Sequence, residues 1–356
     1  MLSSVSKLAD KYFIVGFFLP ALLFSVALLK IFDCPSWAAS VCTPTASVGT
    51  AISDISFAVL FVWTLAVFLT TINYYLYRFF EGYSIVHKRL PFLRVRYQRD
   101  FQNLSNRYKN LRTADRKSEA SKLKARMLQI YPTAVDEVMP TAFGNRIRAF
   151  EVYPRQIYGA DSITIWPRLA SIIPKDFGAQ ISDARSQVDF FVNGCTLASF
   201  IALLFFGDAI SLSIRSGGVT SSAWAQFGFG ALAVATSIVS YICAVGRVVA
   251  WGDLVKSAFD CFLPQLAKQL GYALPAAESK RKTFWGAVSR QMIFGKLIAD
   301  GRFVTIEAGS ESPHAGSKSA ETGENPGEST DDEDEDAAKP GGDEAGHDTV
   351  RSNKQV

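Results

Sequence analysis

Four long apolar runs, separated by stretches rich in charge, set the plan of this chain. They cover residues 12–31, 55–76, 190–206 and 223–245. Each run reaches the roughly 17–25 residues that a helix needs to cross a hydrocarbon core. We therefore predict a mainly α fold, with a four-helix transmembrane bundle made of one hairpin in residues 1–77 and another in residues 189–247.

The first run shares one feature with a secretory signal peptide, because Lys7 and Lys11 precede it. Its apolar stretch is longer than the roughly 7–15 residues of a signal, however, and no small-x-small cleavage site follows it. We expect this run to remain as a membrane anchor.

The polar stretches predict three further segments. Residues 78–188 form a basic, mainly helical domain, residues 248–303 extend the fourth span as a helix, and residues 304–356 form a tail. In the extension, helical spacing persists as far as Pro264. The tail is too rich in Gly, Ser, Pro, Asp and Glu to bury a core, so we predict disorder there.

Within the basic domain, residues 90–131 show apolar positions at helical spacing on two consecutive segments. The positions are Tyr97, Phe101, Leu104, Tyr108 and Leu111, followed by Leu123, Met127 and Ile130. Thr113 is the expected cap of the second helix. The pattern predicts a helical hairpin that packs within the chain. A coiled-coil stalk between subunits is the alternative, because the first seam is heptad-like.

Charge orients the predicted bundle. Residues 77–189 hold 20 Lys/Arg and 11 Asp/Glu, whereas residues 33–54 hold no Lys or Arg and the third connection holds only Arg215. Lys30, at the outer end of the first span, is the exception. Since basic loops stay in the cytoplasm, we predict that both termini are cytoplasmic.

The same charge suggests partners. A basic domain beside a membrane favours anionic lipids at the cytoplasmic face. Nucleic acid is not favoured, because no recognisable nucleic-acid motif accompanies the charge. The tail carries about −10, including the acidic run at residues 331–336. Two roles stay open for it, namely shielding of the basic face and simple solubility.

The five cysteines divide between compartments. Cys34 and Cys42 fall in the predicted outer loop, where a disulfide can persist; the alternative is two small buried side chains. We predict no metal site and no cofactor, because the chain has three histidines and no Cys-x-x-Cys pair.

The densest group of unusual residues lies at residues 140–169. Phe143, Ile147 and Phe150 predict one helix face, which Pro154 should end or kink at Tyr153. A turn signal follows at residues 158–161, and residues 162–166 alternate as in a short strand. The candidate functional residues of this motif are Pro140, Thr141, Gly144, Asn145, Arg146, Arg148, Glu151, Tyr158, Gly159, Asp161, Trp166 and Arg168.

Two interpretations of the motif are open. Glu151 and Asp161 offer carboxylates, and three arginines offer anion binding, but their spacing specifies no reaction. The favoured interpretation is a compact cytoplasmic cap, with aromatic side chains at headgroup level. In it, Glu151 can pair with either Arg148 or Arg155.

The motif Pro140-Thr141, Gly144-Asn145, Glu151, Tyr153-Pro154, Tyr158-Gly159, Asp161 and Trp166-Pro167-Arg168-Leu169 resembles a family of bacterial multi-pass membrane proteins. Phe80-Glu81-Gly82-Tyr83 and Trp251-Gly252-Asp253-Leu254 extend the resemblance, which covers about residues 13–274. The family implies a bacterial inner (plasma) membrane location. It carries no assigned activity, so it supplies no catalytic residues.

The chain has no Walker loop, Gly-x-Ser-x-Gly elbow, His-Glu-x-x-His helix or dinucleotide fingerprint. Its predicted spans contain no clear interior pair of acidic and basic residues, which proton and ion relays usually show. We therefore predict a non-enzymatic role in assembly, scaffolding or regulation, through a protein partner that the sequence does not identify.

Two alternatives remain. One is a homo-oligomeric channel or transporter, with Thr70, Thr71 and Asn73 as candidate lining. The other is a membrane enzyme for a lipid or isoprenoid phosphate, with the anion on Arg146, Arg148 and Arg168.

Overall fold

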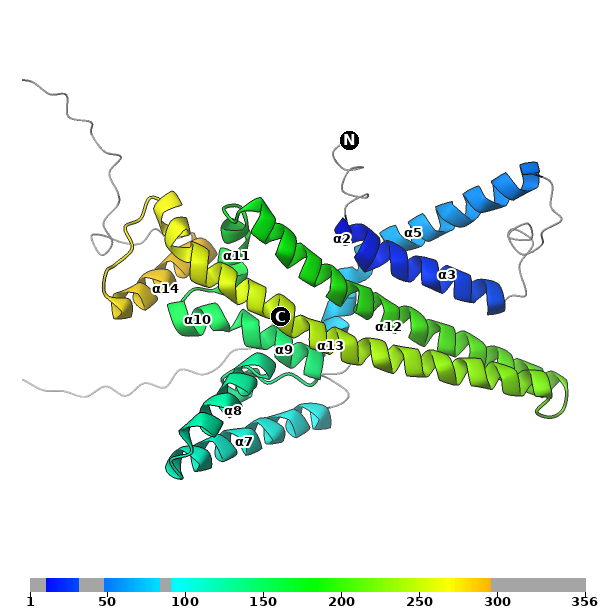
Figure 1. Ribbon diagram of the computed structural model, residues 1–356, viewed down its shortest axis with the longest axis horizontal. Coiled ribbons are helices and arrows are strands. Elements are labelled where there is room, and N and C mark those ends of the chain that lie inside the picture. The colour runs from blue at the N-terminus through cyan, green and yellow to red at the C-terminus, as the bar shows by residue number, and fades with distance from the viewer. Residues whose placement is uncertain (1–10, 32–47, 84–90, 296–356) are drawn as a thin grey trace, which may run out of the picture. The chain divides into compact units, whose positions relative to one another are not determined.

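The computed structural model describes residues 11–31, 48–83 and 91–295. All of them belong to the first of two units into which the chain divides, Met1–Ala308 and Gly309–Val356. The regular elements of this described part are all helical (Figure 1). Four helices are long and apolar enough to cross a membrane: Lys11–Leu28, Ile55–Glu81, Lys175–Arg215 and Ser221–Gln269. A mainly α fold with four such helices is therefore confirmed. The predicted tail, Cys34 and Cys42 lie outside the described residues.

The first apolar helix is continuous but changes its winding. It begins as α2 (Lys11–Phe13), widens into the π-helix η1 (Ile14–Phe18) and continues as α3 (Leu19–Ile31). It packs on α5 (Val48–Glu81) and on α12. The side chains that join these helices are Phe13, Phe17, Ala21, Phe24, Val62, Ala66, Leu69 and Leu197.

The two longest helices, α12 (Lys175–Arg215) and α13 (Ser221–Gln269), pack on each other more extensively than any other pair of described elements. Both continue past the predicted spans. The α13 helix also runs through Pro264, the last position of the helical spacing in the sequence, and ends at Gln269. The extended ends of α12 and α13 carry most of the remaining fold.

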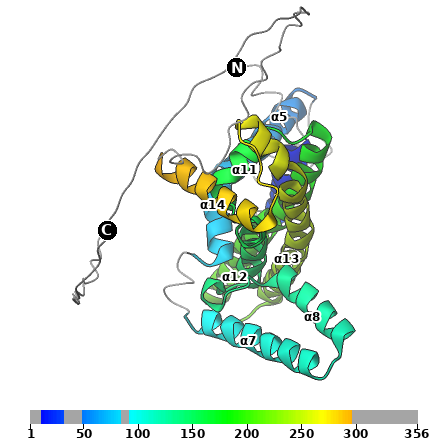
Figure 2. The ribbon, with the colours of Figure 1, turned by 90° about the vertical axis from the view of Figure 1, so that its left-hand side faces the viewer.

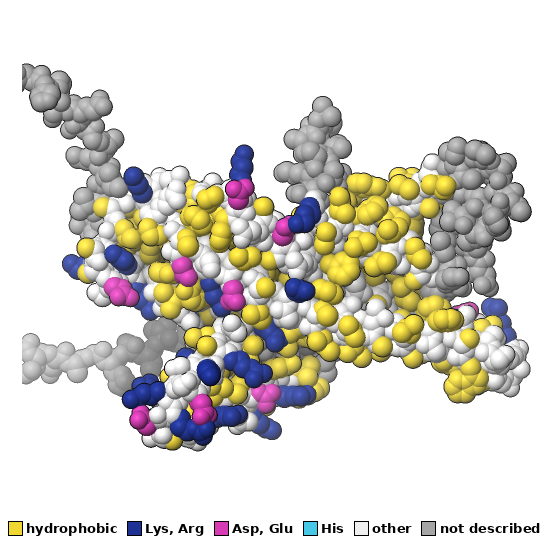
Figure 3. All heavy atoms as spheres, viewed as in Figure 1, with side chains coloured by type: hydrophobic (Ala, Val, Ile, Leu, Met, Phe, Trp, Pro, Cys, Tyr) yellow, Lys and Arg dark blue, Asp and Glu magenta, His cyan; other side chains and the backbone are white. Residues whose placement is uncertain are grey.

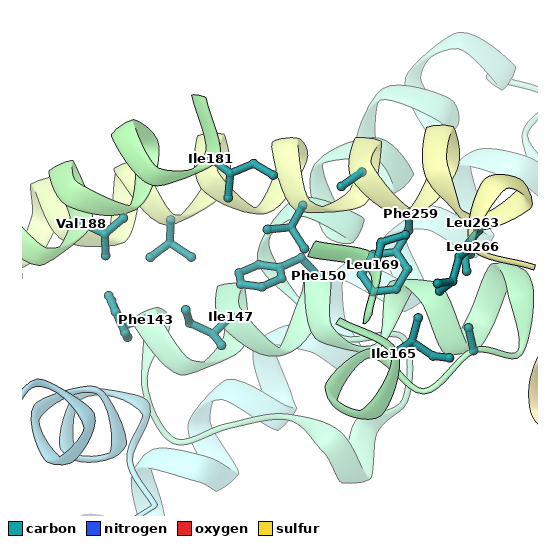
Figure 4. Close-up of a cluster of buried hydrophobic side chains, with 14 of the residues drawn as sticks. Phe143, Ile147, Phe150, Ile165, Leu169, Ile181, Val188, Phe259, Leu263 and Leu266 are labelled. Atoms are coloured by element: carbon teal, nitrogen blue, oxygen red, sulfur yellow. The ribbon is translucent and has the colours of Figure 1, made fainter. Parts of the chain in front are cut away.

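Four short helices surround those ends: α9 (Ala142–Glu151), α10 (Tyr153–Tyr158), α11 (Ser162–Ala170) and α14 (Glu278–Phe294). We call this assembly the helical body. Figure 4 shows side chains of α9, α11, α12 and α13 meeting in its core. Its fully buried members include Phe143, Ile165, Leu169, Val188, Phe259 and Leu263.

Helix α9 approaches α13 closely at one glycine. A Cβ atom on Gly252 would lie 2.6 Å from Cδ1 of Phe150. The Phe150 ring also meets the Trp251 ring edge-on, at 5.1 Å between centroids. Glycine at this position therefore lets an aromatic side chain reach the α13 backbone.

The strand predicted at residues 162–166 is wrong, because this segment begins helix α11. The Asp161 carboxylate accepts a hydrogen bond from the Thr164 backbone N–H at 2.9 Å, which caps the helix. Ile165 and Leu169, four residues apart, are fully buried on one face, whereas Ile163 is 70% exposed. The N-terminal cap and the buried face stabilise a helix here, and an alternation of five residues is too short to distinguish a strand from a helix.

Helices α7 (Pro91–Thr113) and α8 (Lys117–Ile130) form an antiparallel pair that we call the arm. The views in Figures 1 and 2 both show it projecting from one side of the helical body. The prediction that Thr113 caps the second helix of this hairpin is wrong. Thr113 ends α7, where its hydroxyl donates to the Asn110 carbonyl at 2.9 Å, and α8 begins after Arg116 without a side-chain cap.

The surface separates by chemistry along the molecule. In Figure 3, hydrophobic side chains cover α3, α5 and the outer parts of α12 and α13, whereas Lys and Arg gather over the arm. Leu60, Leu203 and Ile242 are each more than 60% exposed on this apolar region. Such exposure is expected where helices face lipid.

Candidate functional site

The first residues of the motif hold α9 against the end of α5. Thr141 caps α9 by accepting from the Gly144 N–H at 2.9 Å, and its hydroxyl donates to the Phe80 carbonyl at 2.7 Å. The buried Asn145 side chain accepts from the Met139 N–H and donates to the Met139 and Thr141 carbonyls, all within 2.9 Å. These polar residues therefore form a structural clamp.

Two glycines make this contact close. A Cβ on Gly144 would lie 2.4 Å from the Glu81 carbonyl oxygen. Gly82 adopts φ +91°, and a Cβ there would lie 2.4 Å from Cγ of Pro140. Both positions exclude a larger side chain, which explains why Gly82, Pro140 and Gly144 occur together.

The arginines of α9 and α10 pair with Glu151 and with Glu137, which lies in the short 3-10 helix η3 (Val135–Glu137) before α9. Arg148 lies 3.4 Å from Glu151 and 3.5 Å from Glu137, and Arg155 also pairs with Glu137. Burial raises the pKa of Glu151, although Arg148 opposes this effect. Of the two predicted partners for Glu151, the structure shows Arg148.

The middle of the motif meets α13 and α14. The hydroxyls of Tyr153 and Tyr158 both donate to Asp260, at 2.9 and 2.7 Å. Burial and the bond to Asp260 raise the pKa of Tyr153 to about 12. Gly159 ends α10 at φ +77°, and a Cβ there would lie 2.2 Å from the Lys282 carbonyl oxygen.

Asp161 and Trp166 have structural roles as well. Asp161 caps α11, and its N–H donates to the Ser289 hydroxyl at 2.9 Å. The Trp166 ring lies 6.0 Å from the Phe259 ring. Both residues hold α11 on α13 and α14.

The three arginines proposed for anion binding do not converge. Arg146 is near the hydroxyls of Tyr97, Tyr131 and Tyr241, and burial lowers its pKa. Arg148 pairs with acids, as described above. Arg168 is exposed and donates to the carbonyl of Thr164 at 2.8 Å within its own helix. A shared phosphate site on these residues has no geometric support.

A second polar cluster, centred on Asp189, lies where the apolar helices meet the helical body. Asp189 is fully buried in α12. It accepts from the Tyr12 hydroxyl at 2.7 Å and from the Asn73 amide at 3.1 Å, and Arg185 Nε lies 3.8 Å away. The Tyr77 hydroxyl interacts electrostatically with Asp189 and Arg185. We call these five residues the Asp189 cluster; they connect α2, α5 and α12.

The π-helix η1 fits around this cluster. Asn193, one turn after Asp189, is fully buried and donates to the Gly16 carbonyl at 2.8 Å. A Cβ on Gly16 would lie 3.2 Å from Cβ of Asp189. Widened helical turns release backbone carbonyls for such bonds and are frequent at functional sites.

The sequence does not reveal this cluster, because Asp189 falls at the boundary between the predicted basic domain and the third span. Asn73 lies on α5, whereas Asp189 and Asn193 lie on successive turns of α12, so no local motif links the three residues. The useful signal was the i, i+4 pair of Arg185 and Asp189 directly before an apolar run.

No family model, curated protein or solved structure matches this chain. The resemblance to bacterial multi-pass membrane proteins therefore stays a prediction.

Chemically, the motif and the Asp189 cluster bind helices together. Among the described residues, no group of three or more His, Cys, Asp or Glu side chains is arranged to hold a metal ion. Of the cysteines in this part of the chain, Cys195 is buried, Cys243 is half-buried and Cys261 is exposed.

Proposed function

We propose that this protein is an integral membrane scaffold that acts without catalysis. Its four apolar helices anchor the helical body, and the arm contacts anionic lipid and a protein partner. The charge pattern supports a cytoplasmic body with both termini on that side of a bacterial inner membrane.

The arm carries this proposal. Between Arg94 and Arg126 the sequence has 11 Lys/Arg and 3 Asp/Glu, and α7 contains no buried residue. The seam positions Tyr97, Phe101 and Leu104 are half-buried in the hairpin, and nine of these eleven basic residues are exposed. The arm thus presents dense positive charge on a folded support.

The base of the arm is fixed to the body. Arg94 donates to the carbonyls of Val138 and Asp136, at 3.1 and 2.6 Å. Gln98 donates to the Val135 carbonyl at 3.1 Å, and α8 packs on α9. A fixed base supports a role in holding partners at a set place beside the membrane.

The alternatives have less support. The Thr70 and Thr71 hydroxyls donate to carbonyls of their own helix, and Asn73 binds Asp189. These candidate lining residues therefore offer no common polar face for a pore. The separated arginines likewise weaken the proposal of a phosphate-binding enzyme.

The test uses the full chain in nanodiscs of neutral phosphatidylcholine, mixed with phosphatidylglycerol vesicles and separated by flotation. Replacing Arg99, Arg107, Lys109 and Lys122 with Gln should weaken co-flotation. At about 1 kcal/mol per basic residue, the loss is on the order of 4 kcal/mol of binding free energy. Raised salt should weaken the wild-type interaction in the same direction.

The matched control replaces four exposed basic residues of the body, Lys268, Lys280, Lys282 and Arg290, with Gln. It should retain most of the binding. If the arm variant floats like the wild type, or if the control loses as much binding, the arm is not the lipid-binding element.

A further inference from the structure

A pocket of about 590 Å³ lies among α9, α11, α12 and α13, apart from the arm. Its walls are mostly apolar and aromatic. They include Phe150, Trp166, Ile173, Ile181, Trp251 and Phe259. Such walls suit hydrocarbon, and the pocket lies beside the level at which the apolar helices enter the helical body.

Arg185 marks that level. It lines the pocket and also belongs to the Asp189 cluster, which contacts Tyr12 at the start of the first apolar helix. Its guanidinium lies 5.8 Å from the Trp251 ring. Arginine and tryptophan side chains of this kind are typical of the boundary between hydrocarbon and headgroups.

Arg185 has binding capacity to spare. Its side chain is 47% exposed, and within the described part of the chain its ion pair to Asp189 is long at 3.8 Å, beside an interaction with the Tyr77 hydroxyl. Besides Arg185, the hydroxyls of Ser162 and Ser182 are hydrogen-bond donors in the lining of the pocket. Within the described residues, neither hydroxyl takes part in a hydrogen bond.

Trp251 contributes its ring to the wall. Its indole Nε1 is buried and has no hydrogen-bond partner among the described residues. Because this nitrogen is buried beneath the wall, the indole ring of Trp251 serves the pocket as apolar surface. Glu151 is the one acidic residue of the lining, and Arg148 already pairs with it. Available donors therefore outnumber available acceptors.

We infer that this pocket binds a phospholipid with an anionic headgroup, with the phosphate on Arg185 and the acyl chains along the aromatic wall. Guanidinium groups form strong charge-assisted hydrogen bonds with phosphate. The lining favours a headgroup with net negative charge, because Arg148 already pairs with Glu151 and no other carboxylate of the lining can balance the ammonium of a zwitterionic lipid. The inference rests on the part of the proposed function that places α12 and α13 in a bilayer. It does not depend on the arm.

Native mass spectrometry of the full chain in detergent tests it, with dioleoylphosphatidylglycerol as the probe. Dioleoylphosphatidylcholine and glycerol phosphate separate lipid binding from binding of neutral lipid or free phosphate. We expect one tightly bound phosphatidylglycerol. Arg185→Gln should weaken it by at least about tenfold, the loss typical of one charged hydrogen bond.

The matched control is Arg168→Gln, because Arg168 is an exposed arginine on α11 that does not line the pocket. It should bind like the wild type. Equal binding of phosphatidylcholine, an equal loss in both variants, or unchanged binding in Arg185→Gln would overturn the inference, as would equal competition by glycerol phosphate.

A second variant separates binding from folding, since Arg185 also contacts Asp189. Gly178 lines the pocket, and the nearest atom to a Cβ there is 4.0 Å away. Gly178→Leu should narrow the pocket without removing a polar group and should weaken lipid binding. Unchanged binding in this variant contradicts the pocket. The four-residue arm variant should still bind this lipid. A failure of the arm proposal can therefore be distinguished from a failure of the pocket inference.

Discussion

Asn145 illustrates how a buried polar side chain can serve the fold. Asn145 is 1% exposed, yet its side-chain amide is fully hydrogen-bonded. The amide oxygen accepts from the Met139 N–H, and the amide nitrogen donates to the carbonyls of Met139 and Thr141. Such complete pairing offsets the cost of burying a polar group. The motif is therefore best explained by the geometry that α9 needs to meet α5.

Gly144→Ala should reveal this close contact. The new Cβ would lie 2.4 Å from the Glu81 carbonyl oxygen, which belongs to the backbone and cannot easily move. We expect a loss of about 1–3 kcal/mol in the free energy of unfolding. Denaturation in detergent micelles measures it.

Gly246→Ala is the control, because Gly246 lies inside α13 with nothing within 4 Å of a new Cβ. Alanine there should stabilise the helix by about 0.5–1 kcal/mol. Equal effects of the two substitutions would show that the approach of α9 to α5 is not tight.

Asp189→Ala should destabilise the junction of α2, α5 and α12. The substitution leaves the Tyr12 hydroxyl and the Asn73 amide without their acceptor. An unsatisfied buried polar group costs about 1–3 kcal/mol, so we expect a loss of about 2–4 kcal/mol. The same denaturation experiment measures it.

Asp208→Ala, on the same helix, provides the comparison. Asp208 is half-buried and forms no ion pair with the described residues. Its replacement should change the stability little. If Asp189→Ala is equally harmless, the cluster does not hold the helices together.

At the scale of elements, long apolar runs were predictable because only a helix can satisfy its own backbone in hydrocarbon. Helix ends were less predictable. The hydropathy falls before residue 190, but α12 begins at Lys175, since the helical body buries Ile181 and Val188. Tertiary packing, which periodicity does not report, extends the helix.

Helix α11 and the π-helix η1 could not be predicted from the sequence, for different reasons. Short alternation at residues 162–166 resembles a strand, whereas the cap at Asp161 and the burial of Leu169 together define a helix. The π-helix depends on Asn193, which is distant in sequence and donates to the Gly16 carbonyl. Contacts between distant helices also create the Asp189 cluster, so local patterns could not predict it.

At the scale of the whole molecule, the separation of apolar and basic surfaces joins the two proposals. The apolar helices define one region and the basic arm another. The helical body contacts both, because it contains the extended ends of α12 and α13 and because α8 of the arm packs on α9. The proposed function requires the helical body to lie on the cytoplasmic side. Cys261, exposed on the α13 extension, is a native reporter of that side.

The decisive measurement uses a variant in which Cys261 is the one remaining cysteine, expressed in bacterial membranes and treated with a membrane-impermeant maleimide. We predict labelling in inverted membrane vesicles and none in intact spheroplasts. The matched control keeps Cys34 alone and should show the opposite pattern. Labelling of Cys261 in intact spheroplasts would place the helical body outside the cell and contradict the account.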